Sequence, residues 1–184
     1  MSEAITLSKG EHTTTRTTYT YEEVLHAAIE YFHGDELAAT TWMNKYAVKD
    51  AKGYYYELTP DDMHWRMARE FAKMEIQFSE KAKLNGAAKN LSAYGQQRAF
   101  LSEKKIYEYF KRFNYIIPQG SVMGVLGNHT MVASLSNCVV LPEIYDSYGG
   151  IFFTDQQLAQ LFKRRCGVGI DISSIRPAGA EVLN

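Results

Sequence analysis

The chain has 184 residues, of which 46% are hydrophobic and 22% charged, and a formal net charge of -1 at pH 7. This length is sufficient for one sizeable hydrophobic core, or for one core and part of a second. The balanced charge gives no electrostatic reason to expect DNA or a membrane as a partner. No apolar run is long enough to span a membrane, and two cysteines without a secretion signal indicate the cytoplasm, where thiols stay reduced.

The first part of the sequence predicts a polar tail and then a helical domain. Residues 1–18 are rich in threonine and are expected to form a flexible tail, whereas residues 19–117 have the periodicity of packed helices. Thr20 and Glu23 have the spacing of a capping box at the start of the first helix, and a glycine ends that helix. A second helix is expected from Asp35 onward.

The middle of the helical domain contains one extended segment and one long helix. Residues 47–58 are expected to be extended, with a turn at 50–53. Thr59 and Pro60, followed by two acidic residues, are typical of a helix start. That helix has an apolar stripe that we interpret as core packing rather than as a cofactor site, formed by Met63, Met67, Phe71 and Met74.

The end of the helical domain is predicted as a loop followed by another helix. Residues 83–100 are polar and contain glycine, asparagine and serine, so we expect a loop. Ser102 is in the position of a cap for a helix that continues to Phe113. Its expected apolar face consists of Ile106, Tyr109, Phe110 and Phe113.

From residue 118 to residue 184 the segments become shorter and are separated by glycines. Ser136–Leu141 is a strand candidate in which Cys138, Val139, Val140 and Leu141 follow one another without alternation, which predicts a strand buried on both faces. Thr154 is expected to cap the next helix, and Gly167 to break it ahead of a second strand with alternating Val168, Ile170 and Ile172. A strand, a helix and a strand in this order predict a parallel βαβ unit.

Two long motifs in this second part resemble the ribonucleotide reductase large subunit: SLSNCVVLPEIYDSYGGI and LFKRRCGVGIDISSIRPAGA. Upstream, GDELAATTWMNKYAVKD, LTPDDMHWRMAREFAKME and YIIPQGSVMGVLGN are similar to its N-terminal helical region. The resemblance covers roughly residues 20–184. It implies an α/β fold with an N-terminal helical domain, followed by the first strands and helix of a ten-stranded α/β barrel that is incomplete in this chain. It also implies reduction of ribonucleotides to deoxyribonucleotides by radical chemistry, in which two thiols become a disulfide.

The resemblance assigns Cys138 to the first of the two reducing cysteines. A thiol in this role donates a proton to the leaving 2′-hydroxyl and then pairs with a second thiol. A buried structural cysteine is the alternative, but within the motif we favour the redox role. Cys166 stands where the family usually has a small residue, and we expect it to pack rather than to pair with Cys138.

The resemblance also implies two nucleotide sites. Ser121, Asn137 and Gly167 are expected to contact the ribonucleotide substrate. A second group, Asp146, Ser147 and Arg176, is similar to the site that binds a dNTP or ATP specificity effector at the subunit interface. As an alternative, Asp146 and Ser147 form a helix cap or turn and Arg176 lies in a solvated loop. The histidines lack metal-ligand spacing, so no metal site is predicted.

The family's remaining catalytic residues are absent from this sequence, so we expect partners. These are the C-terminal remainder of the catalytic subunit, a second catalytic subunit, and thioredoxin or glutaredoxin as the reductant. The radical source is either a metal-containing small subunit or adenosylcobalamin. We expect the chain to be inactive alone, to belong to a split or truncated enzyme, and to lack a separate ATP-binding cone. A noncatalytic nucleotide-binding or assembly module, and a thiol oxidoreductase that uses both cysteines, are the other possibilities.

Overall fold

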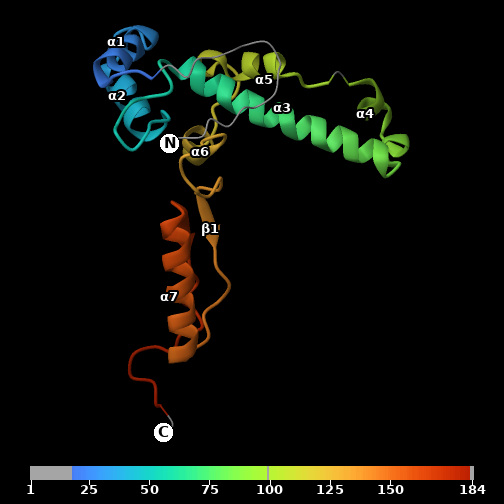
Figure 1. The fold of residues 1–184 in the computed structure, drawn as a ribbon. Helices are drawn as coiled ribbons and strands as arrows, with labels where there is room; N and C mark the ends of the chain where they lie inside the picture. The colour runs from blue at the N-terminus through green and yellow to red at the C-terminus, as the bar shows by residue number, and fades with distance from the viewer. Residues whose placement is uncertain (1–17, 99, 183–184) are drawn as a thin grey trace, which may run out of the picture.

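A layer of helices and a projecting βαβ unit make up the protein in the computed structural model, which describes residues 18–98 and 100–182. Figure 1 shows α1 to α5 in the upper layer, β1 and α7 running side by side away from it, and α6 at the junction. The tail predicted for residues 1–18 lies almost wholly outside the described residues. No helix among the described residues combines the length and apolar character needed to cross a membrane.

The first two helices begin where the sequence predicts. α1 (Tyr21–Tyr31) starts at a complete capping box: the Thr20 hydroxyl accepts a hydrogen bond from the Glu23 N–H, and the Glu23 carboxylate accepts one from the Thr20 N–H. α2 (Glu36–Lys45) starts at Asp35, whose carboxylate accepts a hydrogen bond from the Ala38 N–H at 2.9 Å. Both predictions are confirmed.

The extended segment after α2 is also confirmed. Tyr55 makes antiparallel bridges to Tyr19 and to Lys49. The turn between these partners is closed by a hydrogen bond from the Gly53 N–H to the Asp50 carbonyl, and Gly53 has φ +91°, which glycine tolerates without strain. The segment therefore folds back on itself and reaches the start of the next helix.

The helical core forms where α3 (Pro60–Leu84) packs against α5 (Glu103–Phe110) and the α1–α2 pair. Trp65 of α3 stacks on Tyr107 of α5 with ring centroids 3.9 Å apart. His64 is fully buried beside Phe110 and Phe113, and this burial lowers its pKa below the ordinary range, although Asp61 partly opposes the shift. The fully buried apolar residues of this core are Val24, Ala28, Ala39, Met43, Met63, Met67 and Ala68.

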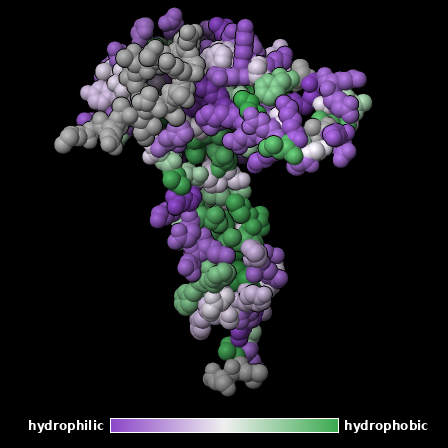
Figure 2. Space-filling view, turned by 45° about the vertical axis from the view of Figure 1, so that its right-hand side comes forward, coloured by the Kyte–Doolittle hydropathy of each residue, from purple (hydrophilic) through white to green (hydrophobic). Residues whose placement is uncertain are grey.

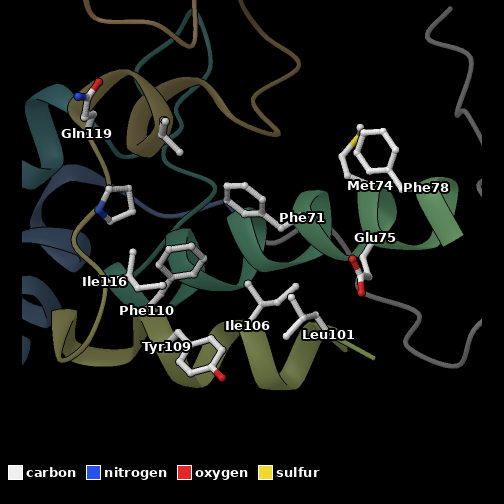
Figure 3. Close-up of a pocket in the computed structure, with 12 residues that line it drawn as sticks. Phe71, Met74, Glu75, Phe78, Leu101, Ile106, Tyr109, Phe110, Ile116 and Gln119 are labelled. Carbon is white, nitrogen blue, oxygen red and sulfur yellow. The ribbon is translucent and has the colours of Figure 1, made fainter. Parts of the chain in front are cut away.

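The prediction that the whole methionine stripe of α3 is core was wrong for its second half. Met63 and Met67 are fully buried, but Phe71 and Met74 are 43% and 44% exposed. They line an open apolar groove of about 600 Å³ between α3 and α5, shown in Figure 3. The physical reason is length: α5 has 8 residues and α3 has 25, so α5 covers only part of the apolar stripe.

Two further predictions in this region need correction. The segment expected to be a loop contains η1 (Ala87–Asn90) and α4 (Ala93–Gln97), and α3 continues to Leu84. The helix after Ser102 ends at Phe110 and is followed by the 3-10 turn η2 (Lys111–Phe113), because Arg112 and Phe113 adopt positive φ. Within α5, Tyr107 rather than Tyr109 lies in the core.

The predicted parallel βαβ unit is present. β1 (Cys138–Val140) pairs in parallel with β2 (Gly167–Gly169), and α7 (Tyr148–Lys163) connects them. α6 (Gly120–Val125) precedes this unit and packs against α3. The helical layer and the βαβ unit are therefore joined at α6.

Two details of the βαβ unit differ from the predictions. α7 starts at Tyr148 and not at Thr154, because the Ser147 hydroxyl caps it; Thr154 lies inside the helix and donates to the Gly150 carbonyl. β1 is not buried on both faces, since the sheet in the described residues has two strands and Val140 is 77% exposed.

Candidate active site

Cys138 and Gly167 lie opposite each other at the start of the two parallel strands. The Gly167 N–H donates a hydrogen bond to the Asn137 carbonyl at 2.7 Å, which fixes this register. A Cβ atom at Gly167 would lie 3.3 Å from the Cys138 sulfur and 3.2 Å from the Asn137 oxygen. Glycine therefore leaves the space beside the exposed thiol open, as close approach of a ligand to a backbone requires.

Ser121 and Asn137 come together next to this pair. The Ser121 N–H, near the start of α6, donates to the Asn137 side-chain oxygen at 2.9 Å. Both residues line a pocket of about 300 Å³, so the structure brings the sequence-predicted Ser121, Asn137, Cys138 and Gly167 into one region.

Two cationic residues of the same pocket were missed by the sequence analysis. Lys45, the last residue of α2, and Arg165, between α7 and β2, both line the pocket with Ser121 and Asn137. Neither forms an ion pair within residues 18–98 and 100–182. Two positive charges in a small pocket are suited to phosphate oxygens.

Arg165 and Cys166 form the turn that leads from α7 into β2. Arg165 has φ +61°, a conformation that costs free energy for any residue other than glycine and that is often found at functional sites. Cys166 is 2% exposed, and its thiol donates to the Gly167 carbonyl at 3.4 Å. Both cysteines are free thiols, and the burial of Cys166 fits the packing role expected from the sequence.

The three residues predicted to bind an effector lie together at the other end of α7. Arg176 Nε donates to the Asp146 carboxylate at 2.7 Å, and its Nη2 donates to the Asp146 carbonyl at 3.3 Å. Ser147 accepts a hydrogen bond from the Gly150 N–H at 3.0 Å. Its side chain therefore caps α7, as in the alternative interpretation of the sequence. Both side chains of the ion pair are about one third exposed, so solvent screening limits the free energy of the Arg176–Asp146 interaction.

No cluster of three or more His, Cys, Asp or Glu side chains suitable for a metal ion occurs in the described part of the chain. The candidate site therefore combines the Cys138 thiol, the backbone of Gly167, the hydrogen-bonding groups of Ser121 and Asn137, and two cationic side chains.

Two family models match the chain. The family model described as ribonucleotide reductase, all-alpha domain, matches residues 32–126, just over half of the chain. The chain belongs to the ribonucleotide reductase large-subunit family. The model described as ribonucleotide reductase, barrel domain, matches residues 136–184. No curated protein and no solved structure matches the chain significantly.

The family explains how the two parts of the structure relate. The helical layer is the all-alpha domain of the ribonucleotide reductase large subunit, and the βαβ unit is the start of its barrel domain. The fold predicted from the sequence is confirmed. The chain is part of an oxidoreductase of deoxyribonucleotide biosynthesis that works as a catalytic subunit within a complex.

Proposed function

We propose that this chain supplies one of the two reducing cysteines, and part of the substrate pocket, to the active site of a ribonucleotide reductase. The observation that carries the proposal is the exposed Cys138 thiol beside Gly167, which has no side chain to crowd the sulfur, next to a pocket with two cations. Substrate approach requires this arrangement, because a thiol can reduce the ribose only when no side chain separates them.

In the proposed reaction the C2′–OH bond of the ribonucleotide is replaced by C2′–H, two thiols become one disulfide, and one water molecule leaves. Cys138 donates its proton to the leaving 2′-hydroxyl and then forms the disulfide with a second cysteine. That second cysteine and the radical-bearing residue belong to the remainder of the barrel. The radical source, a metal-containing small subunit or adenosylcobalamin, initiates the chemistry from outside this chain.

The substrate's phosphates are proposed to occupy the pocket between α6 and the βαβ unit. Lys45 and Arg165 provide positive charge, and Ser121 provides a hydroxyl, all within a pocket large enough for phosphate groups. Binding the phosphates here places the ribose toward Gly167 and Cys138, which are adjacent to Asn137 in the same pocket. The charge count suits a ribonucleoside diphosphate or triphosphate.

A single-turnover experiment tests the role of Cys138. The complete enzyme, which contains this chain and the remainder of the barrel, is reduced, freed of external reductant and mixed with ribonucleotide. We expect deoxyribonucleotide to form and Cys138 to become resistant to alkylation until the protein is reduced again, whereas unfolded protein still has an alkylatable Cys166. Product formation with Cys138 remaining a free thiol contradicts the proposal.

The exposed apolar surface of the βαβ unit supports the proposed partners of the barrel. Figure 2 shows apolar residues over much of this projecting unit, and Val140, Tyr145, Tyr148 and Phe152 are each at least 66% exposed. Such a surface is typical of one that is covered in an assembly. We propose that the rest of the barrel and a second catalytic subunit cover it, that the isolated chain is inactive, and that cytoplasmic thioredoxin or glutaredoxin reduces the completed enzyme.

We further propose that Asp146, Ser147 and Arg176 contribute to a dNTP or ATP specificity-effector site. The charges support this: Arg176 lies beside Asp146 at a partly exposed position, where its guanidinium can turn toward a phosphate. In this proposal Asp146 accepts a hydrogen bond from the effector's sugar hydroxyl.

Replacing Arg176 by alanine should weaken dTTP binding to the complete enzyme by about tenfold, the usual effect of losing one charge-assisted hydrogen bond. Arg69→Ala is the matched control, because Arg69 also forms an exposed ion pair, with Glu103 in the helical layer. Equilibrium binding of labelled dTTP measures the effect. Equal dTTP affinity in Arg176→Ala and the wild type contradicts an effector role, and substrate binding should be preserved in both variants.

A further inference from the structure

Arg66 of α3 makes a buried set of hydrogen bonds that the proposed reaction does not use. Its side chain is 12% exposed and that of Glu57 is 6% exposed. Arg66 Nε donates to Glu57 at 2.7 Å, Nη2 donates to the Met123 carbonyl at 2.8 Å, and Nη1 donates to the Leu126 carbonyl. The second oxygen of Glu57 accepts a hydrogen bond from the Val48 N–H at 2.8 Å. One guanidinium thus joins the extended segment, α3 and the end of α6.

The contacts of α6 continue from Arg66 to the candidate active site. The last turn of α6 carries the carbonyls that Arg66 binds, and its first turn carries Ser121, whose N–H donates to the Asn137 side chain. The Asn137 carbonyl accepts from Gly167 and so fixes the register that sets Cys138 against Gly167. The backbone of α6 and these hydrogen bonds therefore connect the helical core to the strand register at Cys138. In Figure 1, α6 lies where the helical layer meets β1.

The geometry of this contact requires an arginine. The last carbonyls of a helix have no partner within the helix, and a planar guanidinium can bind two of them while it binds a carboxylate on another edge. After α6 the backbone passes close to the Arg66 side chain. Gly127 has φ +75°, and a Cβ there would lie 2.9 Å from Arg66 Cγ. A lysine offers one ammonium and cannot reproduce the three-way contact.

We propose that Arg66 is a positioning residue for the substrate pocket. It fixes α6 against α3, and α6 in turn sets Ser121 and Asn137 at the pocket and the register at Cys138. The consequence for nucleotide binding rests on the proposed function; the placement of α6 by Arg66 does not.

Amide hydrogen exchange in the full chain tests the placement of α6. Arg66→Met keeps an unbranched apolar chain but removes the charge and all three donors. We expect exchange at the Ser121 and Gly167 amides to become at least about tenfold faster, the effect of losing a charge-assisted hydrogen bond. Exchange at Val24 in α1 should not change. Arg69→Met, on the same helix but exposed and paired with Glu103, is the matched control and should leave both amides unaffected.

Conservative variants and a binding measurement complete the test. Arg66→Lys should give an intermediate increase in exchange, and together with Glu57→Gln it provides the comparison if Arg66→Met does not fold. In the complete enzyme the KM for the ribonucleotide should rise about tenfold in Arg66→Met and remain unchanged in Arg69→Met. Unchanged exchange at Ser121 and Gly167 in folded Arg66 variants overturns the proposal, and so does faster exchange with an unchanged KM. If the wild-type enzyme binds no ribonucleotide, the proposed substrate pocket is wrong, and the exchange data alone decide whether Arg66 places α6.

Discussion

Replacement of Cys138 by serine is expected to lower deoxyribonucleotide formation by the complete enzyme by at least about 10³-fold, within the range of losing an essential proton donor. Serine is nearly the same size, but its hydroxyl is a far weaker acid than a thiol and cannot form a disulfide. Because Cys138 is exposed and the substitution removes no core contact, we expect the variant to fold normally. Steady-state turnover with thioredoxin as the reductant measures the effect.

Cys166→Ser provides the control, because this second cysteine of the chain is adjacent to Gly167 but buried. We expect it to keep most of the turnover and to lose some stability, since its thiol packs at a site that is 2% exposed. Full turnover in Cys138→Ser contradicts the redox role and favours the noncatalytic module. Loss of turnover in both variants, each with normal nucleotide binding, instead favours a role for Cys166 in the thiol chemistry.

The starts of the helices were largely predictable because capping is a local interaction. Thr20, Asp35, Thr59 and Ser102 each lie next to the amides that need a partner, so the sequence alone contains the signal. The start of α7 was mispredicted although Ser147 has the same character as these caps. Two glycines in its first turn disfavour a helix by propensity. In the fold Gly150 is required, because a Cβ there would clash with the Tyr145 carbonyl oxygen.

The candidate site was predictable only in part, for a related reason. Cys138, Asn137 and Gly167 were identified because they lie in continuous motifs that resemble a family. Lys45 and Arg165 lie at the ends of two different helices, far apart in the sequence, and no local pattern connects them. Only the packing of α6 between the helical layer and the βαβ unit brings the two cations to one pocket.

β1 has the sequence pattern of a buried strand but is largely exposed in the structure. The run from Cys138 to Leu141 has the pattern of a strand covered on both faces, yet Val140 is 77% exposed. A two-stranded sheet with α7 beside it cannot bury both faces. The match of this segment to a barrel domain accounts for the pattern, because the parallel strands of α/β proteins are typically covered on both faces.

The largest expected effect on stability is at the fully buried part of α3. Met67→Ala should lower the free energy of unfolding of the chain by about 2–5 kcal/mol, because it removes a buried side chain and leaves a cavity that its neighbours fill only partly. Urea unfolding followed by circular dichroism measures the change. Met74→Ala is the matched control: Met74 lies on the same helix and in the same stripe but is 44% exposed, so we expect a change of less than about 1 kcal/mol.

The difference in unfolding free energy between the two methionine variants also distinguishes packing in the core from packing in the groove. Both substitutions remove the same atoms and have the same effect on helix propensity, so that contribution cancels in the comparison. A larger loss in Met67→Ala therefore reports packing in the helical core. Equal losses contradict the burial described here and imply that the groove around Met74 is closed in solution. Because α3 carries both Met67 and Arg66, a loss of packing at Met67 should also loosen the hold on α6, and it should raise amide exchange at Ser121.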